Sequence, residues 1–201
     1  MRIIFVRHGQ TVYNRESKYQ GQMDAQLSEL GLKQAELVAA RLKHENISAV
    51  YSSDLSRARE TAEQIAAYHN MKVNVETGLR ECSFGAWEGL TVSSVMEKYP
   101  VLYSDYQSDS VRFRAPGGER LEELQERTVQ TVEGIVSEHH KSTVLIVTHN
   151  GPIKAFLCHA LDTGLETFRK IRLDNIGITI FSREPGRNWF LETLNDSCHT
   201  L

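Results

Sequence analysis

MRIIFVRHGQTVYN, residues 1–14, is the stretch from which the rest of the chain can be interpreted. Its apolar run 3–6 combines β-branched and aromatic side chains, a pattern typical of a buried strand. The run stops at Arg7-His8-Gly9, so a charged arginine and a titratable histidine stand where a core strand ends. In open α/β sheets, ligands bind in the crevice at the carboxyl ends of the strands. We therefore predict an anion site with a nucleophile inside it, where Gly9 lets the backbone approach a ligand closely or take a positive φ.

Strand and helix patterns alternate along the remaining chain. An apolar stripe at helical spacing follows Ser28, which we expect to be an N-cap, and similar stripes recur later. The alternation predicts an α/β fold, a three-layer α/β/α sandwich with a mostly parallel central sheet, in a single domain over residues 1–201. Helices are expected at 28–45, 56–70, 91–99, 119–140 and 151–161, and strands at 3–6, 47–51, 72–75, 143–148, 176–182 and 188–194. Residues 13–24 and 101–116 are expected to be irregular, the tail from 195 to fray, and about 82–118 to form a small lid.

Composition limits the classes of function. The 201 residues are 40% hydrophobic and 24% charged, with a formal net charge of −3, which is ordinary for a soluble globular protein. That balance gives no basic field for nucleic acid or an anionic membrane, so neither is expected as a partner. No apolar run approaches the roughly 20 residues that cross a bilayer, and the first one is too short for a signal peptide. Three widely separated cysteines argue against a disulfide framework and favour a reducing compartment, so we expect the cytoplasm.

A second corner of the same kind lies later in the chain. The strongly apolar strand 143–148 ends at His149-Asn150-Gly151, where a helix is expected to begin. Arg57 falls in the first turn of another expected helix, where its charge opposes the macrodipole unless an anion lies beside it. The two histidines lack nearby HxxxH or CxxC partners, so a metal site is the weaker interpretation. Arginine forks and backbone N–H groups at a helix start suit phosphate better.

The expected chemistry follows from charge. Arg7 and Arg57 around His8 disfavour its imidazolium form, so the pKa of His8 should fall and leave a neutral ring nitrogen to attack phosphorus. Arginines cannot supply a proton to the leaving alkoxide at neutral pH. Glu81, beside the apolar Cys82, is placed to do so as a carboxylic acid held protonated by partial burial.

In these features the chain resembles the histidine phosphatase superfamily, in its cofactor-dependent phosphoglycerate mutase branch. The motifs that carry the resemblance lie in the right order over about three quarters of the chain. They are Arg7-His8-Gly9-Gln10-Thr11 with Asn14, Tyr19-Gln20-Gly21, Leu27-Ser28-Glu29-Leu30-Gly31, Ser52-Ser53-Asp54-Leu55-Ser56-Arg57-Ala58, the segment 79–89, and Thr148-His149-Asn150-Gly151.

The resemblance implies a role for each matching residue. His8 would become phosphorylated, and Arg7, Arg57 and His149 would hold the phosphoryl group. Glu81 would donate a proton to the leaving group and then act as base for the water that hydrolyses phosphohistidine. The substrate-binding residues are expected to be Asn14, Gln20, Gly21 and Asn150. No metal and no cofactor is expected.

Phosphatase or mutase is the next distinction. Mutases of this branch carry a long insertion after the acidic residue that excludes water, whereas here only about 35 residues separate Glu81 from Pro116. We therefore predict a metal-independent phosphatase for small phosphomonoesters, with a phosphorylated metabolite or inorganic phosphate as its ligand. The segments 84–89 and 116–119 look like those of α-ribazole and broad-specificity phosphatases, although Arg120 and Gln26 depart from the usual pattern.

Other interpretations stay open. An α-ribazole phosphatase of cobalamin biosynthesis and a phosphoglycerate mutase are alternatives within the family. A phosphoprotein-directed member or a non-catalytic phosphate-binding module is the alternative from another class, and the chain is expected to be a monomer or homodimer. Cys82 is not a cysteine-phosphatase nucleophile, because that loop needs an arginine six residues on, where Glu88 stands.

Overall fold

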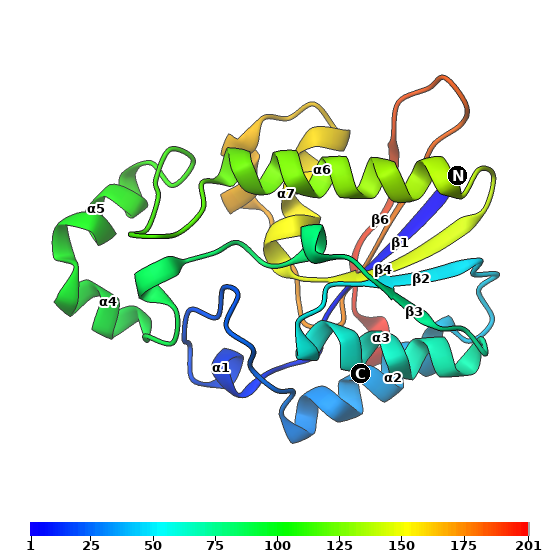
Figure 1. Ribbon diagram of the computed structural model, residues 1–201, viewed down its shortest axis with the longest axis horizontal. Coiled ribbons are helices and arrows are strands. Elements are labelled where there is room, and N and C mark those ends of the chain that lie inside the picture. Colours follow the sequence, from blue (N-terminus) through cyan, green and yellow to red (C-terminus); the bar gives the residue numbers. More distant parts are fainter. Residues whose placement is uncertain (201) are drawn as a thin grey trace.

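A six-stranded sheet forms the centre of the protein in the computed structural model, which describes residues 1–200 (Figure 1). The strands are β1 (Arg2–Arg7), β2 (Ala49–Ser52), β3 (Val73–Val75), β4 (Thr143–Thr148), β5 (Ile178–Ser182) and β6 (Phe190–Asp196). Their spatial order is β3-β2-β4-β1-β5-β6, in which β3, β2, β4 and β1 run parallel and β5 is antiparallel to both of its neighbours. The predicted, mostly parallel sheet is confirmed, and the two strands expected at the end of the chain pair with each other in antiparallel orientation.

Helices cover both faces of this sheet. The α-helices are α1 (Val12–Arg15), α2 (Glu29–Leu42), α3 (Ser56–Tyr68), α4 (Val92–Lys98), α5 (Pro100–Ser108), α6 (Leu121–Glu138) and α7 (Asn150–Ala160). Four 3-10 turns complete the elements: η1 (Thr77–Leu79), η2 (Gly85–Trp87), η3 (Leu165–Lys170) and η4 (Cys198–Thr200). One face of the sheet packs on α6 and α7, and the other packs on α2 and α3. The three-layer sandwich is therefore as predicted.

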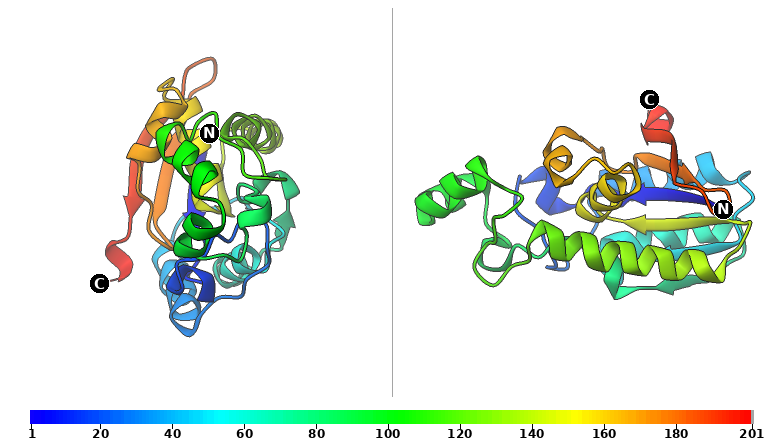
Figure 2. Two further views of the ribbon diagram at one scale, coloured as in Figure 1. Left: turned by 90° about the vertical axis from the view of Figure 1, so that its left-hand side faces the viewer. Right: turned by 90° about the horizontal axis from the view of Figure 1, so that it is seen from above.

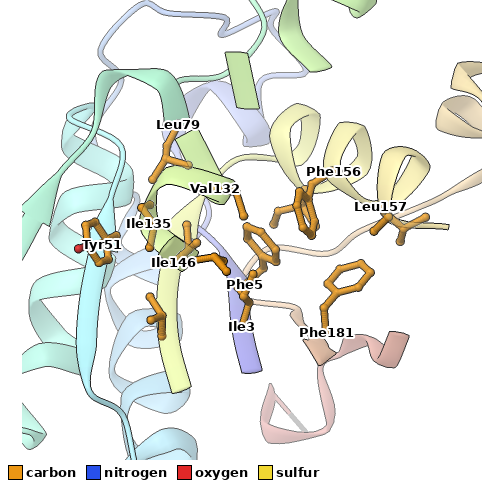
Figure 3. Close-up of a cluster of buried hydrophobic side chains, with 14 of the residues drawn as sticks. Ile3, Phe5, Tyr51, Leu79, Val132, Ile135, Ile146, Phe156, Leu157 and Phe181 are labelled. Atoms are coloured by element: carbon orange, nitrogen blue, oxygen red, sulfur yellow. The ribbon is translucent and has the colours of Figure 1, made fainter. Parts of the chain in front are cut away.

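Alternation along β1 divides the core into two halves. Ile3 and Phe5 point to the side of α6 and α7, where Phe5 packs against Phe156 and Phe181 (Figure 3). Ile4 and Val6 point to the side of α2 and α3. Because a strand buried on both faces has apolar residues at every position, the continuous run 3–6 follows from the place of β1 inside the sheet.

Part of the segment between η2 and α6 has a secondary structure that differs from the prediction. Residues 101–116 were expected to be irregular, and this is wrong for α5, which begins at Pro100. Proline suits the first position of a helix, where its missing N–H is not needed, so Pro100 ends α4 and starts α5. Tyr103 and Tyr106 of α5 pack with Phe113 around the fully buried Trp87.

The α4–α5 pair lies at one end of the sandwich, the end at which α1 follows β1 (Figures 1 and 2). It has an aromatic core of its own, separate from the two cores that flank the sheet. This arrangement places the predicted lid region beside the carboxyl ends of the parallel strands.

Two further local expectations can be compared with the structure. Ser28 is the N-cap of α2, because its hydroxyl accepts a hydrogen bond from the Gly31 N–H at 3.1 Å. The expected irregular stretch 13–24 is wrong at its start, where α1 forms behind a capping box of Thr11 and Asn14. The tail was expected to fray from 195, whereas β6 continues to Asp196 and η4 follows it.

Candidate active site

Two strand ends bring the predicted histidines together. β1 and β4 are adjacent and parallel, with Arg7 opposite Thr148, so His8 and His149 leave the sheet side by side. The His8 N–H donates to the Thr148 carbonyl at 3.0 Å, and the two imidazole centroids are 5.0 Å apart. Both side chains are buried, with exposed fractions of 2% and 0%. The site therefore lies at the carboxyl edge of the parallel strands, as the sequence predicted.

The proton position on His8 follows from its backbone contact. Nδ1 lies 2.7 Å from the carbonyl oxygen of Gly9, which can only accept a hydrogen bond. Nδ1 must therefore carry the proton, and in the neutral ring Nε2 keeps its lone pair. The amide of Asn175 donates to the His8 carbonyl at 2.9 Å and holds the same turn from the other side. His8 is thus oriented as a nucleophile through Nε2.

His149 has the complementary arrangement. Arg57 Nε donates to Nδ1 of His149 at 3.2 Å, so Nδ1 is the acceptor and the proton of the neutral ring lies on Nε2. Nε2 of His149 is buried and has no hydrogen-bond partner among residues 1–200, and the same holds for Nε of Arg7. Buried donors without acceptors are costly, so two such groups in one corner indicate a place for an anion.

Backbone carbonyls hold the two arginines. Arg57, on the first turn of α3, donates to the carbonyls of Gly21 and Met23, each at 2.8 Å. Arg7 Nη1 donates to the carbonyl of Leu173. No carboxylate pairs with either guanidinium in the described chain, which keeps their positive charge available to a ligand.

The loop under Arg57 depends on Glu88. Its carboxylate accepts hydrogen bonds from the N–H groups of Gln22, Met23 and Phe84 at 2.9–3.1 Å. Gly21 has a φ of +52°, and a Cβ there would stand 2.0 Å from a Glu88 carboxylate oxygen. Gly21 therefore suits this turn by its backbone freedom and by its lack of a side chain.

Glu81 meets the histidine corner at the start of α7. The Glu81 carboxylate accepts hydrogen bonds from the Gly151 N–H at 3.0 Å and from the N–H of the next residue, Cys82, at 2.8 Å. A Cβ on Gly151 would lie 2.1 Å from the Glu81 carboxylate, so glycine is required for this approach. Thr148 supports the other side by donating to the Leu79 carbonyl at 2.6 Å. A carboxyl group, an imidazole lone pair and unpartnered N–H donors thus share one corner.

Burial controls the charge of the imidazoles. Desolvation lowers the pKa of His8 well below its ordinary value, and the charges of Arg57 and Arg7 lower it further. Burial also lowers the pKa of His149, with Arg57 as the next cause. The predicted direction for His8 is confirmed, but burial is a larger cause than the arginines.

Comparison with known proteins agrees with this geometry. The family model of the histidine phosphatase superfamily (branch 1) matches residues 3–197. The chain belongs to the histidine phosphatase superfamily. It is 40% identical over 203 residues to a metal-independent phosphoserine phosphatase of Arabidopsis thaliana, covering 98% of this chain and 82% of that protein.

Two further relatives are similar over nearly their whole length. Phosphoserine phosphatase 1 of Hydrogenobacter thermophilus is 35% identical over 199 residues, covering 99% of this chain and 94% of that protein. A phosphoserine phosphatase from Entamoeba histolytica, solved in complex with phosphoserine, superposes with a TM-score of 0.88 at 30% identity, over 100% of this chain and 99% of that one. The chain is thus a phosphatase-type member of the superfamily, a phosphoric monoester hydrolase.

The four residues that the superfamily resemblance assigned to substrate binding have different surroundings from one another. Asn150 is the first residue of α7 and lines a cavity together with Glu81. Thr11 contacts both Asn14 and Gln20. Its N–H donates to the Asn14 side-chain oxygen at 3.0 Å, and its hydroxyl donates to the Gln20 side-chain oxygen at 2.8 Å. The Gly21 carbonyl accepts a hydrogen bond from Arg57 at 2.8 Å. The contacts of Asn14 and Gln20 seen here are within the protein.

Of the two options predicted for Gly9, a positive φ is not found, and Gly9 closely approaches another part of the backbone. Its φ is not in the left-handed region, and a Cβ on it would lie 2.5 Å from the Gly31 carbonyl oxygen. Gly31 in turn lies against the backbone of Gln10. The close approach is therefore between the end of β1 and the start of α2, which fixes the histidine turn against the helix.

Several residues of the site were not predicted from the sequence. Arg127 and Gln22 donate to the Glu81 carbonyl at 3.0 and 3.3 Å and position that residue, as Asn175 does for His8. Lys154 lines the cavity beside Asn150. Only Lys154 left a usable signal, because it lies one helical turn after Asn150 on the same face of α7.

Two other expectations concern cysteine and metal. Cys82 is buried in a small apolar cluster, and burial raises the pKa of its thiol, so it is a packed thiol as expected. Within residues 1–200, no three His, Cys, Asp or Glu side chains gather closely enough to hold a metal ion. None of the helices over those residues combines the length and apolar character needed to cross a bilayer.

Proposed function

We propose that the protein hydrolyses small-molecule phosphomonoesters through a phosphohistidine on Nε2 of His8, without a metal ion. The observation that carries this proposal is the convergence of the His8 lone pair with the unpartnered donors of Arg7 and His149 in one buried corner. Arg57 adds a second cation to that of Arg7 there. A phosphoryl group bound in this corner would accept hydrogen bonds from all three residues.

The reaction has two steps. In the first, His8 Nε2 forms a bond to phosphorus as the bond from phosphorus to the alcohol oxygen breaks, and Glu81 gives its proton to the departing oxygen. In the second, Glu81 takes a proton from water, whose oxygen attacks phosphorus. The P–N bond then breaks, its electron pair returns to His8, and inorganic phosphate leaves.

The named relatives indicate a first substrate. Two are phosphoserine phosphatases by name, and the Entamoeba histolytica structure holds phosphoserine. We therefore infer that phosphoserine and similarly small esters are the first substrates to test. The three free cysteines support a reducing compartment, for which the cytoplasm is our proposal.

The decisive experiment is hydrolysis of p-nitrophenyl phosphate and phosphoserine in the presence of a chelator. We expect wild-type activity to persist with chelator and to fall at least about 1,000-fold in His8→Ala, since the nucleophile is lost. With a substrate labelled on its phosphoryl group, rapid quenching at high pH, where phosphohistidine survives, should leave the label on the protein only when His8 is intact. Activity that requires added metal or survives His8→Ala would overturn the proposal.

A further inference from the structure

Lys154 is a buried cation that the phosphoryl chemistry above does not use. It lies on α7, its exposed fraction is 9%, and within residues 1–200 its ammonium makes no ion pair or hydrogen bond. Nζ lies over the ring of Phe168, 5.0 Å from its centroid. Burial lowers the pKa of Lys154, while the charge of Glu81 opposes that effect. A cation on a mostly buried side chain that faces a cavity without a charged partner points to a ligand that supplies the missing charge.

The ammonium opens into the space in front of the catalytic corner. Glu81, Asn150 and Lys154 line a cavity of about 250 Å³, with Phe84 and Phe168 among its apolar walls. A second hollow shares Asn150 and Lys154 with this cavity and reaches Arg7. The phosphoryl corner and Lys154 are therefore connected through the same face of α7.

Charge in the second hollow is entirely positive. Its basic lining residues are Arg7, Lys154, Arg169, Lys170 and Arg172, and none of the residues that line it is acidic. The first cavity has one acidic residue, Glu81, which the reaction already uses. An anion placed beside Lys154 would meet no carboxylate of the protein other than that one.

Helix geometry places Lys154 on the same side of α7 as Asn150, because it follows Asn150 by four residues. The Asn150 turn is also the end of α7 that reaches Glu81, since the Gly151 N–H donates to that carboxylate at 3.0 Å. An anionic group of the leaving alcohol that extends from this end along the same side of α7 would meet Lys154.

We propose that Lys154 binds a carboxylate on the leaving alcohol, so that the substrates are compact phosphomonoesters that carry a carboxylate. This inference rests on the proposed phosphatase function and names its substrate class. Of the two cations that line this cavity, Arg169 already donates to the carbonyls of Tyr106 and Gln107, which leaves Lys154 for a singly charged group such as a carboxylate.

The test compares substrates that differ only at the carboxylate. Phosphoserine is paired with phosphoethanolamine, and 3-phosphoglycerate with glycerol 3-phosphate. The measured quantity is the ratio of kcat/KM within each pair. We expect the wild type to favour the carboxylate member at least about tenfold, and Lys154→Met to lower that ratio about tenfold, mainly through KM, because a charge-assisted hydrogen bond is lost.

Two variants serve as controls. Lys154→Arg keeps the charge and should keep most of the ratio, whereas Lys33→Met removes a lysine from the exposed face of α2 and should keep all of it. If Lys154→Met fails to fold, Lys154→Gln replaces it, and a wild-type ratio near one overturns the inference without any variant.

The outcomes separate this inference from the phosphatase proposal. If Lys154→Met lowers kcat/KM equally for both members of a pair, Lys154 either acts on Glu81 or serves only the packing of the protein. Either result would overturn carboxylate binding. A shift of the pH–rate profile would then identify the effect on Glu81. Failure of the phosphatase proposal would look different, since the wild type would hydrolyse no member of either pair, or would do so without His8.

Discussion

Each imidazole of the catalytic corner is held in one proton arrangement by a single neighbour. The Gly9 carbonyl fixes the proton of His8 on Nδ1, and Arg57 fixes that of His149 on Nε2. One ring thus presents a lone pair and the other a donor, although they are 5.0 Å apart and equally buried. Two copies of the same residue type therefore take opposite chemical roles because their backbone and guanidinium neighbours differ.

The buried neutral histidines should make stability depend on pH. Their pKa values are lowered in the folded protein, so below about pH 6.5 the unfolded chain binds protons that the folded one does not. Stability should be full above that pH and should be lost as pH falls. We expect the stability difference between wild type and His8→Gln to decline by about 1.4 kcal/mol per pH unit below 6.5. Urea unfolding from pH 7.5 to 5 measures this, and parallel curves for the two proteins would contradict it.

Gly151 gives a test of the acid that does not alter Glu81 itself. In Gly151→Ala the new Cβ would displace the carboxylate, which stands 2.1 Å from its position. We expect kcat/KM for phosphoserine to fall at least about 100-fold, because an alkoxide leaving group needs the proton. The loss for p-nitrophenyl phosphate should be much smaller, because nitrophenolate leaves without one.

The matched control for this prediction is Gly134→Ala on α6, where no atom lies within 4 Å of the new Cβ. That change should leave both activities intact and stabilise the protein by about 0.5–1 kcal/mol. Equal losses for the two substrates in Gly151→Ala would show that the glycine serves folding rather than the acid.

Elements with one dominant signal were predictable from the sequence. β1 and β4 are continuous apolar runs, and α2 has both a cap and an apolar stripe. α5 was missed because Pro100 can equally end one helix or begin the next, and its stripe faces aromatic residues of a small separate core. That core depends on Trp87, whose burial only the folded chain reveals.

The catalytic corner was predictable for a related reason. Arg7 ends β1, His8 and His149 follow β1 and β4, and parallel strands end at one edge of a sheet. Asn175 reaches the site through the packing of the turn before β5, which no local pattern in the sequence encodes, so finding it needed the tertiary structure. Lys154 left one signal, its position one helical turn after Asn150, but only the structure shows the cavity that it lines.

Arg169 connects α5 to the body of the protein. It donates to the carbonyls of Tyr106 and Gln107 at 3.2 and 3.1 Å, and its guanidinium lies 5.2 Å from the Tyr106 ring centroid. In Arg169→Ala we expect amides of α5 to exchange with deuterium about tenfold faster, because local opening loses these contacts. Amides of β1 and β4 should be unaffected, and Arg59→Ala on α3 should change neither region. Unchanged exchange in α5 would show that its aromatic core alone holds it.

The local charge beside the catalytic corner is opposite in sign to the net charge of the protein. The formal net charge is −3, yet the hollow beside the catalytic corner is lined by basic residues without an acidic one. A local field of this kind concentrates anionic substrate even on a protein that repels it overall. The protein as a whole therefore has no positive field, as its net charge indicates, and the attraction for anions is confined to the hollow beside the catalytic corner.

This confinement predicts that the position of a charge matters more than its number. Lys170→Gln/Arg172→Gln removes two exposed cations beside the site, and Lys33→Gln/Lys43→Gln removes two from the α2 region, so both change net charge equally. At 10–20 mM salt we expect the first variant to lower kcat/KM for phosphoserine about threefold to tenfold, and the second to lower it less than twofold. At 0.5 M salt the first variant should approach the wild type, because the Debye length is then shorter than the distance over which exposed charges act. Equal effects of the two variants would mean that net charge governs substrate capture, and a loss that persists in high salt would mean that Lys170 or Arg172 touches the substrate directly.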